Sequence, residues 1–325
     1  MRIVKVNKDS IANILSDLLK RSPTNYGDFQ DKVDAIIKNV RDNGDKAVFD
    51  YTAQFDKAEI NAENILVTEE EIKEAYEEVD DELIKVIRKA IKNIRDFHEK
   101  QIQKSWFETR EDGVMLGQKV TPMETCGVYV PGGKAVYPSS VLMNIVPAHV
   151  AGVKNIIMTT PPGKDGKVTA NTLVAAKEAG ATKVYKVGGA QAIAAMAFGT
   201  ESIPKVDKIV GPGNIFVALA KKAVYGNVSI DSIAGPSEIL VLADETANPR
   251  YVAADLLSQA EHDEMASAIL VTTSEELAHK VSDEIDGFLN QLSRKEIMEK
   301  SLDSFGYILV ASDMKEAIDT ANAIA

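Results

Sequence analysis

Apolar side chains in the first hundred residues recur every three or four positions, which is the spacing of amphipathic helices. The helices predicted from this spacing cover residues 9–21, 28–43, 45–55 and 68–101. Asn43 and Gly44 break the second predicted helix from the third. The longest helix is interpreted as packed on its own domain, although a coiled-coil seam also fits its spacing.

A different pattern begins after a predicted hairpin at Trp106–Val120, whose turn is Asp112-Gly113. Beyond Pro122, short apolar runs alternate with helices, and the predicted strands are at 127–130, 154–162, 183–187 and 208–210. Four strand-loop-helix units in about a hundred residues predict a parallel, doubly wound sheet with helices on both faces.

The alternation resumes in the last third of the chain. Predicted strands at 239–243, 268–272 and 307–311 are separated by helices, which indicates a second α/β sheet. The first 120 residues are expected to complete this second sheet. The predicted organisation is therefore a discontinuous α/β domain of residues 1–126 plus 231–325, with N-terminal helices, into which a domain of residues 127–230 is inserted.

The composition limits the function classes. At 325 residues and 45% hydrophobic content, the chain is long enough for about two domains. A formal net charge of -12 disfavours nucleic acid and anionic membranes as general partners. The sequence has neither an apolar run of about 18 residues nor the apolar core of a signal peptide, which predicts a cytoplasmic protein.

Glycine-rich loops follow the strands of the predicted inserted domain. Ligands of such sheets bind beyond the carboxyl ends of the strands, where Gly188, Gly189, Gly211 and Gly213 would gather. These glycines permit close backbone approach to a phosphate, but they equally suit tight turns that bind nothing. The dinucleotide fingerprint G-x-G-x-x-G is absent, so the pattern alone does not establish a nucleotide.

The stretch 231–262 contains the most suggestive polar pair. Asn248 and Pro249 predict the start of a helix whose last turn carries Gln259 and His262, three residues apart and hence on one face. Histidine is a common zinc ligand, whereas an amide oxygen is an unusual one. The same pair also suits an ordinary helix end in water, where His262 would interact favourably with the helix dipole.

The remaining reactive residue types receive structural interpretations. The single cysteine, Cys126, borders an apolar run and is predicted to be a buried structural residue. His98, His149 and His279 lie in predicted helices without an accompanying motif, and we expect them to be inert. No H-E-x-x-H occurs, which disfavours a zinc hydrolase.

Several long segments together resemble histidinol dehydrogenase, and the similarity spans nearly the whole chain. The segments are RDNGDKAVFDYTAQFD, YVPGG, VGGAQAIAAMAFGTESIPKVDKIVGPGN, DSIAGPSEILVLAD and LLSQAEH. The resemblance implies a homodimer built on two incomplete Rossmann-like domains. It also implies oxidation of L-histidinol through a bound aldehyde to L-histidine, with two NAD and a zinc ion that positions the substrate.

The resemblance assigns residues to roles one by one. It implies NAD contacts at Tyr129, Gln191 and Asn214, and substrate contacts at Ser237, Gln259 and His262, of which Gln259 and His262 would also bind zinc. The family's catalytic Glu-His pair and its other two zinc ligands have no counterpart before Ala325. The chain is thus expected to correspond to the first three quarters of the enzyme, to contain no catalytic base and to be inactive alone. The alternative is a two-domain small-molecule-binding protein without redox activity.

Overall fold

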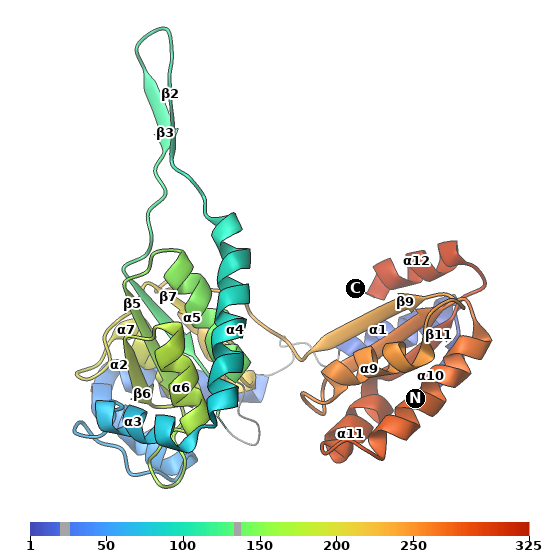
Figure 1. Ribbon diagram of the computed structural model, residues 1–325, viewed down its shortest axis with the longest axis horizontal. Helices are drawn as coiled ribbons and strands as arrows, with labels where there is room; N and C mark the ends of the chain where they lie inside the picture. Colours follow the sequence, from blue (N-terminus) through green and yellow to red (C-terminus); the bar gives the residue numbers. More distant parts are fainter. Residues whose placement is uncertain (20–26, 133–137, 325) are drawn as a thin grey trace. The chain divides into compact units, whose positions relative to one another are not determined.

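A computed structural model describes residues 1–19, 27–132 and 138–324, which belong to two compact units (Figure 1). The terminal unit combines Met1–Asn25 with Gly235–Ala325, and the central unit is Tyr26–Ala234. Each unit has its own parallel sheet and its own hydrophobic cores. The predicted α/β class with two parallel sheets is confirmed.

The central unit is built on a five-stranded sheet in the order β6-β5-β4-β7-β8, with every neighbouring pair parallel. The strands are β4 (Thr125–Tyr129), β5 (Asn155–Thr160), β6 (Lys183–Lys186), β7 (Lys208–Val210) and β8 (Ser229–Ile230). Apolar side chains of the central strands are buried on both faces, as in parallel sheets covered by helices on both sides. The chain enters the sheet at β4, in the middle, so the strand order reverses between β4 and β7.

Helices cover both faces of this sheet. One face packs on α5 (Pro138–Val150) and α6 (Ala170–Ala179), with α3 (Glu69–Glu78) and α4 (Asp81–His98) outside them. The other face packs on α2 (Gly27–Phe55), α7 (Gly189–Phe198) and α8 (Ile215–Val224). The buried residues of α7 are mostly alanine, which allows α2 and the sheet to approach it closely.

Residues 26–126 correct the predicted domain boundary, since they belong to the central unit and not to the discontinuous one. The reason is packing: the apolar face of α2 is buried against α7 and α8, and α4 is buried against α5 and α6. Only the first 25 residues join the C-terminal segment, because β1 (Arg2–Lys5) pairs with β11 (Gly306–Val310). Periodicity predicts that α2 and α4 each bury one face, but it does not say against what.

Local signals explain where these helices end. Gly44 has φ +53° and separates the two halves of α2, as the sequence predicts. The predicted helix 68–101 is in fact two helices and a short 3₁₀ turn (Glu99–Gln101), because Val79 is extended and Asp80 starts a new helix by accepting a hydrogen bond from the Glu82 N–H. Thr68 and Glu71 form a capping box at the start of α3.

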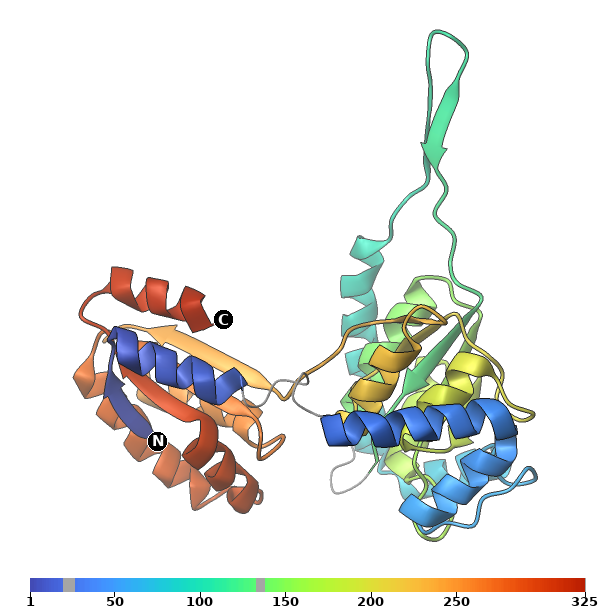
Figure 2. The same cartoon turned by 180° about the vertical axis from the view of Figure 1, so that it is seen from behind.

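A hairpin projects from the body of the central unit (Figure 2). Its strands, β2 (Trp106–Thr109) and β3 (Met115–Gln118), pair antiparallel around the Asp112-Gly113 turn, which confirms the predicted hairpin. All residues of both strands are exposed, including Trp106 and Phe107.

The terminal unit has a four-stranded parallel sheet in the order β1-β11-β10-β9. Its remaining strands are β9 (Glu238–Ala243) and β10 (Ser267–Thr272). One face packs on α9 (Pro249–Ala260), α10 (Glu275–Leu289) and α11 (Lys295–Phe305), and the other on α1 (Lys8–Leu19) and α12 (Met314–Ile324). None of the helices formed by the described residues is both long enough and apolar enough to cross a membrane.

Candidate functional site

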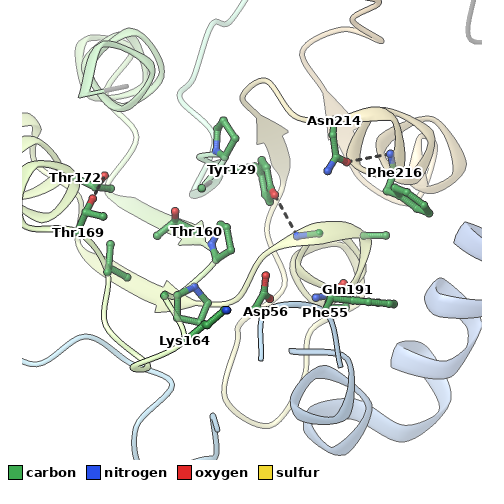
Figure 3. Close-up of a pocket in the computed structure, with 18 of the residues that line it drawn as sticks. Phe55, Asp56, Tyr129, Thr160, Lys164, Thr169, Thr172, Gln191, Asn214 and Phe216 are labelled. Atoms are coloured by element: carbon green, nitrogen blue, oxygen red, sulfur yellow. Dashed lines mark hydrogen bonds between the residues drawn. The ribbon is translucent and has the colours of Figure 1, made fainter. Parts of the chain in front are cut away.

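A pocket of about 690 Å³ lies at the carboxyl edge of the central sheet (Figure 3). Its walls come from the segments after β4, β5, β6 and β7 and from the end of α2. The strand order reverses between β4 and β7, and open α/β sheets bind ligands at such a switch point. The pocket volume is in the range of known small-molecule and cofactor sites. The last glycine of YVPGG lies in 133–137, outside the described residues.

Three residues for which the family resemblance implies a cofactor role, Tyr129, Gln191 and Asn214, line this pocket together. Tyr129 ends β4, Gln191 is in the first turn of α7, and Asn214 caps α8 by accepting hydrogen bonds from two backbone N–H groups of that helix. The backbone N–H of Gly189 donates a hydrogen bond to the Tyr129 hydroxyl oxygen at 3.1 Å. These three residues therefore converge at one edge of the sheet.

The loop that carries Asn214 is fixed by close packing. A Cβ atom at Gly211, which has φ +117°, would lie 2.0 Å from the carbonyl oxygen of Tyr129. The buried Lys221 donates to the Gly211 carbonyl at 2.9 Å and pairs with Asp231, which in turn accepts the Gly211 N–H at 2.8 Å. Gly211 is therefore required by packing, independent of any ligand.

Buried polar atoms without partners mark one wall of the pocket. Gln191 is 1% exposed, and no group among the described residues hydrogen-bonds to its Nε2 atom. The Oδ2 atom of Asp56, which directly follows α2, is likewise buried without a described partner. Buried polar groups in proteins are nearly always hydrogen-bonded, so two such atoms in one pocket indicate a place where water or a ligand supplies the partners.

Burial also changes the acid-base behaviour of this wall. It raises the pKa of Asp56 to about 6. Burial raises the pKa of Tyr129 to about 12, and the Asp56 charge adds to this effect, whereas the Gly189 N–H opposes it. The Tyr129 hydroxyl therefore keeps its proton at neutral pH and can donate a hydrogen bond to a ligand. Asp56 was not singled out by sequence reasoning, because it lies beyond the last apolar position of its helix.

The other candidates, Ser237, Gln259 and His262, belong to the terminal unit. Ser237 precedes β9, and its carbonyl oxygen accepts a hydrogen bond from the Ser267 N–H at the start of β10. Gln259 is in the last turn of α9, whereas His262 lies two residues beyond the end of that helix, in the turn that leads to β10. The His262 N–H donates to the Gln259 carbonyl at 3.1 Å. All three therefore lie at the amino edge of their sheet, with Gln259 half-buried and His262 exposed.

The residues of the central pocket fit NAD better than Gln259 and His262 fit zinc. The central pocket fits NAD, since it lies at a switch point and offers buried hydrogen-bonding atoms without partners. For zinc, the described residues contain no cluster of three or more His, Cys, Asp or Glu side chains. Gln259 and His262 could provide two of the four ligands that zinc usually takes, so these residues do not complete a zinc site.

Cys126 is a core residue of β4, as the sequence predicts. It is 4% exposed, and burial raises the pKa of its thiol to about 11. A thiol with such a pKa is almost entirely protonated at neutral pH, and it is the thiolate that reacts. Cys126 therefore does not contribute a nucleophile to the pocket.

The fold and the pocket define a Rossmann-like protein of two α/β units with a site suited to a dinucleotide. More specifically, the chain belongs to the histidinol dehydrogenase family, whose model matches residues 19–325. It is therefore an oxidoreductase of histidine biosynthesis.

Sequence and structure comparisons agree on this family. The chain is 57% identical to histidinol dehydrogenase of Bacillus subtilis, with 99% of this chain and 75% of that protein aligned. It is 54% identical to the Halalkalibacterium halodurans enzyme, with 100% and 75% aligned. A crystal structure of histidinol dehydrogenase from Elizabethkingia anophelis matches with a TM-score of 0.92 and 39% identity, over 100% of this chain and 74% of that one. The chain spans about three quarters of the length of these relatives.

Proposed function

We propose that the protein oxidises L-histidinol through a bound aldehyde to L-histidine with NAD as oxidant. Membership of the family supports the reaction. The observation that supports a cofactor site in this chain is the buried, unpartnered Nε2 atom of Gln191 in a pocket at the sheet's switch point.

The pocket residues would hold the cofactor by complementary hydrogen bonds. Gln191 would donate from its amide, Tyr129 would donate from its protonated hydroxyl, and Asn214 would present the side-chain nitrogen that does not cap α8. When bound, NAD supplies the acceptor for the hydride that leaves the carbinol carbon. Because these groups are fixed by β4, α7 and α8, they are positioned before the ligand arrives, which reduces the entropic cost of binding.

The terminal unit would bind the substrate through Ser237, Gln259 and His262. Their common position at one sheet edge supports a shared role. Gln259 and His262 would also serve as two of the ligands of a zinc ion that positions the substrate, and further ligands would have to come from outside the described residues.

The chemistry sets further requirements. Hydride departs only as the hydroxyl proton is removed, so a base with a pKa near 7 must lie within hydrogen-bond reach of the substrate. The aldehyde must then take up water and lose a second hydride. We assign no residue of this chain to proton removal. We also propose that the protein is a cytoplasmic homodimer that requires neither nucleic acid nor a membrane.

The reaction is tested by adding L-histidinol and NAD to a polypeptide that spans the full length of the relatives, and by following NADH absorbance. Turnover of histidinol, with histidine as product, is the expected outcome. His262→Ala should lower bound zinc and turnover together, while the exposed His279→Ala serves as a matched control. Full zinc content and full activity in His262→Ala would remove this residue from the proposed site.

A polypeptide limited to these 325 residues should bind NAD yet turn over little histidinol. The absence of general acid-base catalysis alone lowers the turnover rate by a factor of roughly 10²–10⁴. Calorimetric titration with NAD, zinc and histidinol, beside an activity assay of the complete enzyme, tests this expectation. Turnover near that of the complete enzyme would refute it.

A further inference from the structure

Asp56 places a carboxylate on the wall of the central pocket. It follows Phe55, the last residue of α2, and its backbone N–H continues the helix by donating to the Thr52 carbonyl at 2.9 Å. Its side chain lines the pocket beside the first turn of α7, the helix against which α2 packs (Figure 3). The carboxylate therefore belongs to the same wall as Gln191.

The protein does not compensate the buried oxygen of Asp56. Among the described residues, no donor reaches the Oδ2 atom, and Asp56 forms no salt bridge. Of the described cations near the pocket, Lys57 donates to the Gln54 carbonyl at 2.7 Å, Lys167 pairs with Glu74 at 3.0 Å, and Lys164 is exposed. A half-buried carboxylate without a partner is destabilising, which is typical of groups kept for binding.

The same wall offers one unpaired acceptor, at Asp56, and one unpaired donor, at Gln191. The complementary ligand surface therefore combines a donor with an acceptor, as a ribose hydroxyl or the edge of adenine does. We propose that the Asp56 carboxylate binds the cofactor by accepting a hydrogen bond from one of its donor groups, a ribose hydroxyl or an amino group. This inference rests on the proposed NAD site and adds an anionic residue to it.

The test measures binding of NADH to the 325-residue chain by calorimetry, without turnover. Asp56→Asn removes the charge at nearly constant shape, and Asp50→Asn, on the exposed side of the same helix, removes one charge elsewhere. Because hydrogen bonds to charged groups are the stronger ones, we expect Asp56→Asn to weaken binding roughly tenfold or more. Asp50→Asn should bind like the unchanged protein. Circular dichroism confirms that each variant is folded.

The pH profile separates a binding role from a merely structural one. The affinity of the unchanged chain should fall as pH decreases through 6, because the carboxylate becomes protonated. Among the described residues, the other titratable groups that line the pocket are Tyr129, Lys164 and Lys167, and all three are retained in Asp56→Asn. The profile of Asp56→Asn should therefore be flat over this range.

Two analogues identify the donor. Nicotinamide hypoxanthine dinucleotide lacks the amino group, and NADPH carries a phosphate on a ribose hydroxyl. If the adenine amino group is the donor, the hypoxanthine analogue should bind weakly to the unchanged chain. Asp56→Asn should then cause no further loss of affinity for this analogue. If the hydroxyl is the donor, Asp56→Asn should improve NADPH binding relative to NADH. Either result supports the proposal, whereas equal affinities and equal pH profiles for the unchanged chain and Asp56→Asn overturn it. Failure of the unchanged chain to bind NADH would overturn the proposed cofactor site as well.

Discussion

The two units use the same kind of sheet but present their candidate residues at opposite edges. In the central unit they lie at the carboxyl edge, inside a pocket and on helices that start there. In the terminal unit they lie at the amino edge, before β9 and at the end of α9. The carboxyl edge gathers helix N-termini and their free N–H groups, whereas the amino edge gathers helix ends and their carbonyl groups.

The candidate residues of the two units also differ in how deeply they are buried. Within the described part of the central unit, two buried polar atoms have no hydrogen-bond partner, and such atoms lower the stability of the ligand-free protein. The terminal unit leaves His262 in solvent, where it has no comparable desolvation cost. In the central unit, substitution of these residues should therefore weaken ligand binding without lowering the stability of the ligand-free protein. In the terminal unit, substitution of His262 should change the stability of the ligand-free protein little.

The largest effect is expected for Gly211→Ala. The added Cβ would meet the Tyr129 carbonyl at 2.0 Å in a backbone conformation that alanine rarely adopts. We expect a loss of roughly 3 kcal/mol of unfolding free energy and no measurable NAD binding. Denaturant titration and calorimetry provide the two readouts.

Gly287→Ala is the matched control in the terminal unit. Gly287 lies inside α10, and nothing lies within 4 Å of an added Cβ. Alanine there should stabilise the unit by about 0.5–1 kcal/mol. If both glycine variants lost stability equally, the close contact at Gly211 would not explain its effect.

Gln191→Met should separate binding from stability. The substitution keeps the volume of the side chain but removes the unpartnered Nε2 atom, so the ligand-free chain should unfold at the same temperature or higher. NAD affinity should fall roughly tenfold, because a buried donor is lost. Unchanged affinity with lowered stability would mean that Gln191 is a packing residue.

Asp56→Asn should stabilise the ligand-free chain in a pH-dependent way. Because burial raises the pKa of Asp56 from 3.8 to about 6, the ionised carboxylate destabilises the fold above that pH. The variant should gain about 1–2 kcal/mol near pH 8, a value reduced for partial exposure. The gain should shrink as pH falls from 6 and vanish below 3.8. Thermal unfolding at pH 4, 6 and 8 measures this, and a gain independent of pH would contradict it.

His262→Ala should have the smallest effect on the ligand-free chain. The side chain is exposed, so unfolding free energy should change by no more than about 0.5 kcal/mol. NAD affinity should be unchanged, because the pocket belongs to the other unit. A decrease in NAD affinity would show that His262 influences the central pocket.

Much of the fold follows from the sequence because its signals are local. Alternating apolar runs and helical spacing predict the parallel sheets, Asn43-Gly44 predicts the break in α2, and Asn248-Pro249 predicts the start of α9. Glycines after strands likewise indicate the carboxyl edge where Tyr129, Gln191 and Asn214 meet. In these cases a few neighbouring residues contain the required information.

The remaining features depend on distant parts of the chain. The assignment of α2 to the central unit requires its partner surface on α7, more than a hundred residues away. In the sequence, Asp56 resembles any polar residue at the end of a helix. Only the folded structure shows that it lines a pocket with the segments after β4 and β6. β1 was missed because a four-residue edge strand has too few positions to show a period, and the division of 68–101 because the apolar spacing continues across Val79.

The inert thiol in β4 has a practical consequence for spectroscopy. Cys126 is the only cysteine in the chain, and it is buried with a pKa of about 11. Maleimide or spin-label reagents applied to the folded protein at neutral pH should therefore leave it largely unmodified. A cysteine introduced at an exposed position such as Glu111 at the hairpin tip, with a second one in the terminal unit, can carry a dye pair without first replacing Cys126. Distances between the two units, with and without NAD, then become measurable on an otherwise unaltered core.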